Sequence, residues 1–228
     1  TQDNWTYWDT AETAYGYDGY GNRTWETVYA GYGPMRQQGE TIVRVSLPTQ
    51  PRTTQIDYNH SGSGFHLYPE RVVYPLSALV ERASYDYRLG VLTSYTDMNG
   101  KTTSYVYDAL GRVVKVIRPG DDTDRPTVRV SYLDWGTPGM ERVLVQRREI
   151  SGQAGTVDEE RYFDGLGRPI QVQKEADGGQ EVVQTTLYDA FGRKVAEVVP
   201  YFSTAGSGYR APGTNPRTQT SYDALGRV

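Results

Sequence analysis

Short segments in which apolar and polar residues alternate run through most of the chain, and they predict β-strands. Residues 168–173 read Arg, Pro, Ile, Gln, Val, Gln, which places Ile170 and Val172 on one face of a strand. Val128 and Val130 share one face of another strand in the same way, and residues 40–47 also alternate. We therefore expect an all-β fold in which the Ile and Val face of each strand is packed.

A six-residue motif separates these strands: an aromatic residue, Asp, any residue, Leu or Phe, Gly and Arg. Its four close copies span residues 107–112, 163–168, 188–193 and 222–227. Asp is preferred at the first position of a type I turn, where its carboxylate caps the backbone two residues on. The Gly takes the positive φ of a G1 bulge. The motif thus predicts a hairpin tip, in which the aromatic residue ends one strand and the Arg begins the next and can reach back to the Asp.

Variants of this turn extend the array in both directions. Residues 17–23 keep the Asp and Gly with Asn in place of Arg, residues 97–100 form a shorter copy, and residues 86–90 and 132–136 are looser ones. The residues assigned to the turns are Tyr17, Asp18, Gly21, Asp97, Gly100, Tyr107, Asp108, Gly111, Arg112, Phe163, Asp164, Gly167, Arg168, Tyr188, Asp189, Gly192, Arg193, Tyr222, Asp223, Gly226 and Arg227.

Each interval between tight turns also holds a second, more variable turn, at residues 119–122, 151–152, 177–179 and 205–208. Two strands and two turns per interval make an antiparallel meander, with tight turns along one edge of the sheet and variable loops along the other. Right-handed twist and repeated bulges curl such a sheet, so we expect a spiralling wall.

The motif resembles the YD-repeat, or RHS-repeat, family, which is found in bacterial polymorphic toxins, in the B and C components of insecticidal Tc toxins and in the extracellular part of teneurins. The resemblance is clearest from about residue 85 to the end. It implies a segment of a hollow cocoon that encloses a C-terminal toxic domain. The implied partners are the remainder of the shell, its enclosed effector domain and a Tc-like partner subunit, and the implied location is secreted or at the cell surface.

The chain divides by composition at residue 80. Residues 1–80 are rich in aromatic residues with degenerate repeats, and residues 81–228 carry the regular array, which we expect to continue one sheet. Leu76, Leu79, Val80 and Ala83 have helical spacing, but the neighbouring Val and Tyr residues favour extended chain. The family's self-cleavage region and effector domain are missing, so we expect a fragment of a longer protein whose export signal lies outside it.

Composition supports extensive sheet and excludes several classes of function. The 228 residues include 25 Gly and 20 Tyr but only 4 Phe and no Cys, so packing and ladder hydrogen bonds must supply the stability. The net charge is −4 and the Lys and Arg residues are scattered, which argues against nucleic acid as a partner. No apolar run approaches the roughly 18–20 residues that span a bilayer.

The aromatic N-terminal third offers an alternative function. Trp5, Trp8 and Trp25 could form a platform on which a sugar stacks, as in a carbohydrate- or protein-binding module of an adhesin-like protein. Packing of aromatic residues on a pleated sheet explains the same pattern without a ligand.

Candidate catalytic and metal-binding residues are few. His60, Ser61 and Asp57 are the residue types of a catalytic triad, but they lie in a Gly/Ser-rich loop without a strand-turn-helix elbow. A zinc site formed by His60, His66, Asp57 and Glu70 is no better supported. Asp121, Asp122 and Asp124 lack the ligand order of an EF-hand loop. We therefore expect no metal, no cofactor and no enzymatic activity.

Overall fold

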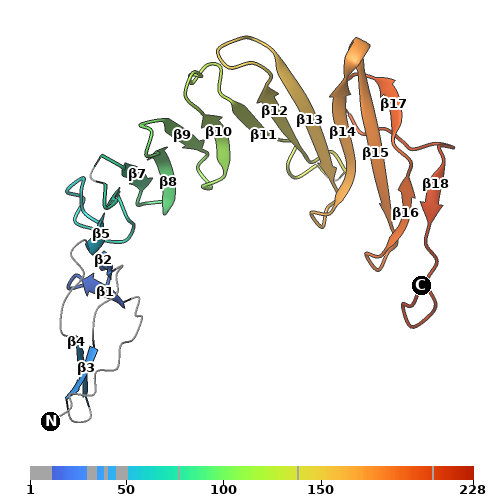
Figure 1. The fold of residues 1–228 in the computed structure, drawn as a ribbon. Coiled ribbons are helices and arrows are strands. Elements are labelled where there is room, and N and C mark those ends of the chain that lie inside the picture. Colours follow the sequence, from blue (N-terminus) through green and yellow to red (C-terminus); the bar gives the residue numbers. More distant parts are fainter. Residues whose placement is uncertain are drawn as a thin grey trace. The chain divides into compact units, whose positions relative to one another are not determined.

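The chain folds into antiparallel β-strands (Figure 1). This computed structural model describes residues 12–29, 35–38, 41–44, 51–76, 78–137, 139–206 and 208–228. Within them, the only helical element is a single 3-10 turn, η1, at Asp177–Gly179. No helix in these ranges is long and apolar enough to cross a membrane.

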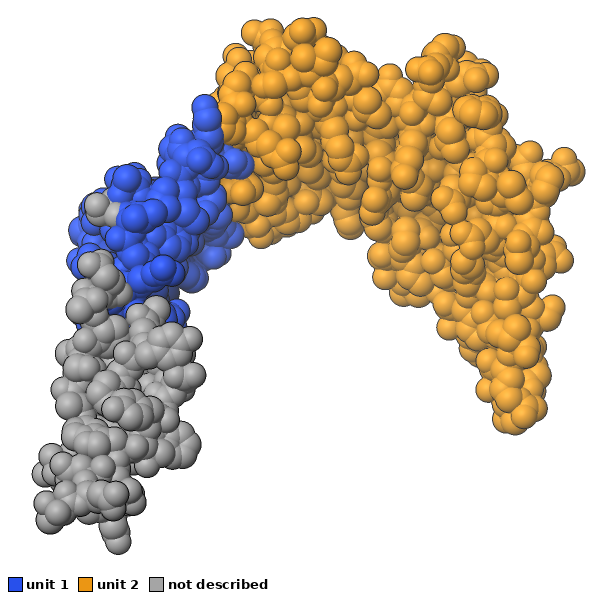
Figure 2. Space-filling view, viewed as in Figure 1, with its two compact units in different colours: residues 1–104 blue, residues 105–228 orange. Residues whose placement is uncertain are grey.

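The chain forms two compact units, residues 1–104 and residues 105–228 (Figure 2). Strands of the first unit are β1 Glu12–Tyr17, β2 Arg23–Tyr29, β3 Met35–Gln38, β4 Thr41–Arg44, β5 Pro51–Asp57, β6 Arg71–Val73, β7 Val80–Asp86 and β8 Val91–Thr96. Strand β7 agrees with the prediction of extended chain at Val80 and Ala83. The compositional boundary at residue 80 stays a prediction.

The second unit contains the most regular strands. After β9, Thr102–Tyr107, which spans the boundary between the units, they are β10 Val113–Ile117, β11 Val128–Leu133, β12 Arg142–Arg148, β13 Thr156–Phe163, β14 Pro169–Ala176, β15 Gln180–Tyr188, β16 Lys194–Val198, β17 Tyr201–Thr204 and β18 Arg217–Gln219. The apolar face predicted over residues 168–173 falls in β14.

Of the strands that the structure describes, sixteen belong to one sheet, in which almost every strand pairs with its neighbours in sequence. The order is β1-β2-β5-β6-β7-β8-β9-β10-β11-β12-β13-β14-β15-β16-β18, with β17 on β15, while β3 and β4 form a separate pair. The sheet is open, since β1 and β18 end the order. The all-β antiparallel meander of hairpins is therefore confirmed, and its curl stays a prediction.

Besides the separate β3–β4 pair between β2 and β5, the meander of the described strands is interrupted after β16. Strand β15 is long enough to pair with β16 through residues 186–188 and with β17 through residues 180–183. The chain then runs from β17 through residues 205–216, here called the strap, before β18 pairs with β16. The fourth variable turn predicted from the sequence, at residues 205–208, is thus the beginning of a longer connection.

The face of β14 that is buried is the opposite of the one predicted. Ile170 and Val172 are half-buried, whereas Gln171 and Gln173 are almost fully buried. The reason is that the strap lies over the glutamine side, where backbone groups of Gly208 and Arg210 exchange hydrogen bonds with both amides. Amide side chains can be buried there because the strap supplies partners for Gln171 and for Nε2 of Gln173, although Oε1 of Gln173 has no partner among the described residues.

Candidate functional site

The repeated turns share one set of hydrogen bonds, seen clearly at Asp108. The N–H of Asp108 donates to the carbonyl of Arg112 at 3.0 Å, and the N–H of Gly111 donates to the carbonyl of Asp108 at 3.0 Å. Oδ1 of Asp108 accepts from the N–H groups of Leu110 and Arg112 at 2.9 and 3.0 Å, and Oδ2 accepts from Arg112 Nε at 2.7 Å. One carboxylate therefore holds both the turn and the first residue of the outgoing strand.

The other tight turns repeat this geometry. The carboxylates of Asp18, Asp97, Asp164, Asp189 and Asp223 each accept the N–H two residues on and the N–H four residues on. The turn glycines Gly21, Gly100, Gly111, Gly167, Gly192 and Gly226 all have φ between 74° and 87°, which disfavours every residue with a side chain. Asn22 takes the place of the Arg in the first of these turns and donates to Asp18 at 3.1 Å.

Acid is expected to destabilise the fold through these carboxylates. The hydrogen bond from the N–H of Arg112 lowers the pKa of Asp108; burial raises this pKa, and the guanidinium of Arg112 lowers it again. The side chain of Arg88 lowers the pKa of Asp86 to about 2. A carboxyl with a depressed folded pKa stabilises the protein fully above its unfolded pKa of about 3.9, and that stabilisation is lost as the pH falls toward the folded value. Urea midpoints should therefore decrease from about pH 5 to about pH 2.

Substitution of one turn carboxylate provides the control for this pH dependence. Asp108→Asn lowers the midpoint at neutral pH and makes its decrease in acid shallower, because one titrating group is gone. An unchanged midpoint between neutral pH and about pH 2 would contradict the role given to the turn carboxylates.

Three of the turn Arg residues also contact the aromatic residue that begins the next turn along the array. The Cζ atom of Arg168 lies 4.6 Å from the ring centre of Tyr188, and that of Arg193 lies 4.6 Å from the ring centre of Tyr222. Arg112 approaches the ring of Tyr132 to 3.9 Å. Guanidinium groups at these distances attract the π face of the ring.

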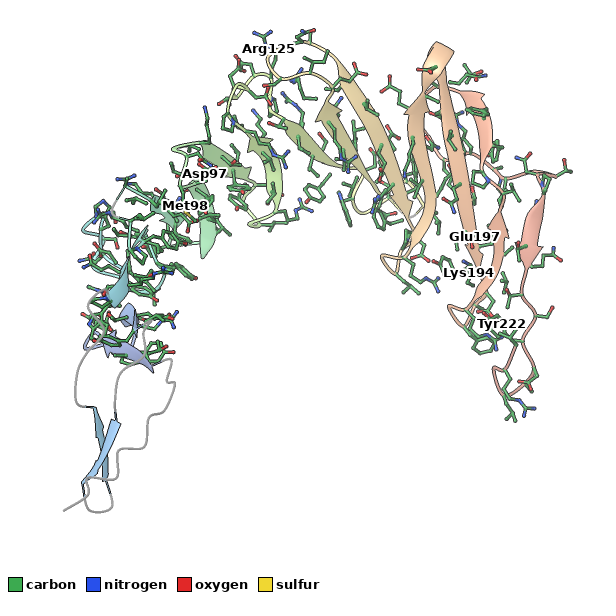
Figure 3. The ribbon with its side chains drawn as sticks, in the orientation of Figure 1. Asp97, Met98, Arg125, Lys194, Glu197 and Tyr222 are labelled. Atoms are coloured by element: carbon green, nitrogen blue, oxygen red, sulfur yellow. The ribbon has the colours of Figure 1, made fainter. Side chains whose placement is uncertain are left out.

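The hydroxyl groups of the same tyrosines form hydrogen bonds at these junctions. Tyr188 donates from its hydroxyl to the carbonyl of Pro169, the residue after Arg168, at 3.3 Å. Tyr222 donates in the same way to the carbonyl of Lys194 at 2.9 Å, and the two residues lie together at the turn end of β16 (Figure 3). Each of these turns is therefore docked on the one before it by an Arg, an aromatic ring and a hydroxyl.

The worn copy at residues 132–136 makes the junction differently. Trp135 stacks on Phe163, the aromatic residue of the next turn, with ring centres 6.3 Å apart. Asp134, whose φ is 55°, forms an ion pair with Arg142 from β12 in place of a turn Arg. An aromatic contact thus replaces the Arg contact where the motif has lost its Arg.

The tips of the turns are apolar and exposed. Leu110, Leu166, Phe191 and Leu225 occupy the same place in the four close copies, and each projects into solvent. The Leu or Phe of the motif is therefore not a core residue.

The triad-like residues of unit 1 do not form a triad. Ser61 donates its hydroxyl to Glu70 at 2.8 Å, whereas His60 Nδ1 lies 3.5 Å from Asp57 Oδ2. Glu70 is buried and also accepts from Ser63 and Tyr87. Burial raises the pKa of Glu70, but the hydrogen bonds from Tyr87 and Ser61 together lower this pKa by more. Glu70 is therefore held as a carboxylate. Glu70 organises this loop.

The acidic loop after β10 is also occupied by internal hydrogen bonds. Asp121 accepts from Thr127, from Ser151 and from the N–H of Gly152, so it ties two variable loops together. Asp122 caps the N–H groups of Asp124 and Arg125. No cluster of three or more His, Asp or Glu side chains suited to a metal occurs in the part of the chain that the structure describes.

Of the three tryptophans proposed to stack on a ligand, only Trp25 lies within the described residues. Its indole ring lies over Gly16 of β1, and the side chain borders a cavity on one face of unit 1. Trp5 and Trp8 lie outside the described residues.

Sequence reasoning missed the junctions between turns and the polar network under the strap. The motif does contain a signal for the junctions. An Arg stands in every close copy, and an exposed ion pair with the Asp is too weak to require it. The strap leaves no such signal, since Gln171 and Arg210 are far apart in the chain.

Comparison with known proteins agrees with the repeat pattern. Residues 85–123 match the family described as RHS Repeat, and residues 144–228 match a domain of unknown function, DUF6443. No curated protein matches the chain. Among solved structures, the fold is similar to the crystal structures of TcdB2-TccC3-Cdc42 and TcdB2-TccC3-TEV, with 13% and 12% sequence identity and TM-scores of 0.58 and 0.59.

The likeness to those structures covers nearly all of this chain but a small part of theirs. It includes 95% of this chain for TcdB2-TccC3-Cdc42 and 99% for TcdB2-TccC3-TEV. The chain spans 16% of the length of each of those chains. At this identity the likeness concerns the fold.

Proposed function

Because residues 85–123 match the RHS Repeat family, we propose that this chain forms a segment of a secreted or surface-exposed toxin shell that encloses or presents a C-terminal effector. Its role in this proposal is structural: the wall excludes solvent and partners from the cargo. The partners would be the remainder of the shell, the effector and a Tc-like subunit.

The observation that carries the proposal is the docking of successive turns on one another in the second unit. Arg168 contacts Tyr188, and Arg193 contacts Tyr222, by the same geometry one hairpin further on. An array in which each repeat contacts its neighbours extends in one dimension without a central core. Such an array is suited to a wall, because strands can be added at its edge without changing the strands already in place.

Two further features support a wall. Most side chains of the sheet are half-buried, and the buried ones in β13 to β15 include Gln171, Gln173 and Thr185 together with Tyr162 and Val183. A single sheet with polar groups on its faces can meet water or a polar cargo on either side. The fold is also similar to a crystal structure of TcdB2-TccC3 without its hypervariable C-terminal region.

Limited proteolysis of the full-length natural protein tests enclosure. We expect the region that follows the repeats to resist protease in the native protein, because the wall excludes the enzyme. The variant Gly192→Val, which disturbs one turn of the wall, should accelerate cleavage of that region.

The control for this experiment is Gly165→Ala, at a turn position that other copies fill with Ala. It should leave protection unchanged. If the C-terminal region of the native protein is cleaved as rapidly as it is in urea, the chain does not enclose it.

A further inference from the structure

One face of unit 1 carries a cavity of about 480 Å³ over strands β2, β5 and β6. The register of these strands places Trp25 opposite Gln55 and Gln55 opposite Val73, and it places Asp57 opposite Arg71. Residues directly opposite each other in antiparallel strands point to the same face of the sheet. The cavity is therefore lined by side chains of three adjacent strands.

The indole ring of Trp25 forms a flat wall of this cavity. It lies across Gly16, so closely that a Cβ atom on Gly16 would be 1.9 Å from the indole Nε1. The side chain of Trp25 is nevertheless 38% exposed. Its inner surface therefore rests on bare backbone, and its outer surface is available to a ligand.

Polar groups of both kinds surround the ring. Thr27 and Thr53 share a hydrogen bond of 2.8 Å between their hydroxyls, and Gln55 is exposed beside them. Asp57 supplies a carboxylate and Arg71 a guanidinium. The Nε atom of Arg71 is buried and has no hydrogen-bond partner among the residues that the structure describes. A buried donor of this kind normally has one.

We infer that this cavity binds a neutral carbohydrate. A pyranose ring has an apolar C–H face, which fits a flat indole, and a rim of hydroxyls that both donate and accept hydrogen bonds. The amide of Gln55, the carboxylate of Asp57 and the guanidinium of Arg71 supply the complementary donors and acceptors. One carboxylate and one guanidinium balance in charge, which favours an uncharged sugar. This inference does not rest on the proposed shell.

The test starts with the labelled 228-residue chain on an array of neutral and acidic oligosaccharides. The neutral oligosaccharide that is retained best is then titrated while tryptophan fluorescence is recorded. Trp25→Ala and Gln55→Ala should each weaken binding by about tenfold or more, since each removes a contact to the sugar. Gln55 is exposed, so its replacement leaves the fold intact even if Trp25→Ala does not.

The matched control is Tyr15→Ala. Tyr15 is an exposed aromatic residue on the adjacent strand β1, but it is paired with Glu26 and lies on the opposite face. It should bind the oligosaccharide like the parent chain. Retention of acidic oligosaccharides alone, retention of none, or equal affinity of the parent and Gln55→Ala would each overturn the inference.

Discussion

Gly192→Val is expected to lower the free energy of unfolding by about 1.5–4 kcal/mol. Gly192 has a φ of 82°, where valine costs about 1–3 kcal/mol of backbone strain. In addition, a Cβ atom there would lie 2.5 Å from Nη1 of Arg168, the Arg of the preceding turn. The guanidinium can move away, but it then loses its contact with Tyr188, worth about 0.5–1 kcal/mol. Urea denaturation measures the total change in the free energy of unfolding.

Two other turn glycines provide matched controls. Gly111 has a φ of 76° and open space where its Cβ would lie, so Gly111→Val should cost about 1–3 kcal/mol through strain alone. Gly165 has neither a positive φ nor a close neighbour, and the same place holds Ala in three other copies. Gly165→Ala should be neutral or stabilise by up to about 1 kcal/mol.

Tyr162→Ala is expected to cost about 3–5 kcal/mol, the range for removal of a large buried ring. Tyr162 is fully buried beneath the strap. Its hydroxyl accepts the N–H of Gly208 at 2.7 Å and donates to Glu160. Truncation leaves a cavity and removes the partner of a strap backbone group, so the strap should also exchange its amide hydrogens faster.

Tyr162→Phe separates the ring from the hydroxyl. It keeps the packing but leaves the N–H of Gly208 without its partner, which should cost about 1–3 kcal/mol. In thermal or urea unfolding, Tyr162→Phe should be more stable than Tyr162→Ala. Equal stability of Tyr162→Ala and the parent would show that the strap does not cover this face.

The turns could be predicted from the sequence because their determinants are local. Asp108 and Gly111 act within five residues of chain, and the carboxylate, the positive φ and the reversal of direction all follow from their spacing. The turns then determine the number and the direction of the strands on either side. The antiparallel meander follows from these local turns.

The buried face of β14 could not be predicted, because its cover comes from distant chain. Alternation in residues 168–173 is correct, but it cannot show which side a later segment will cover. Gln171 donates to the carbonyl of Arg210 and accepts from its N–H, and these hydrogen bonds make the polar side the buried one. Apolar character alone therefore gave the wrong face.

The candidate site in unit 1 was predicted only in part. Trp25 attracts notice as an aromatic residue, but Asp57 was considered only as a triad or zinc candidate, and Arg71 is an ordinary charge in the sequence. They meet beside Trp25 only through the register of three strands, which the turns alone do not determine.

The most direct test of a wall built from docked turns is to measure Gly192→Val in two backgrounds, the parent chain and Arg168→Ala. If Arg168 couples consecutive turns, the cost of Gly192→Val in the Arg168→Ala background falls to that of Gly111→Val, because the group that clashes is absent. An equal cost in both backgrounds would mean that the turns are independent of one another, which contradicts the account.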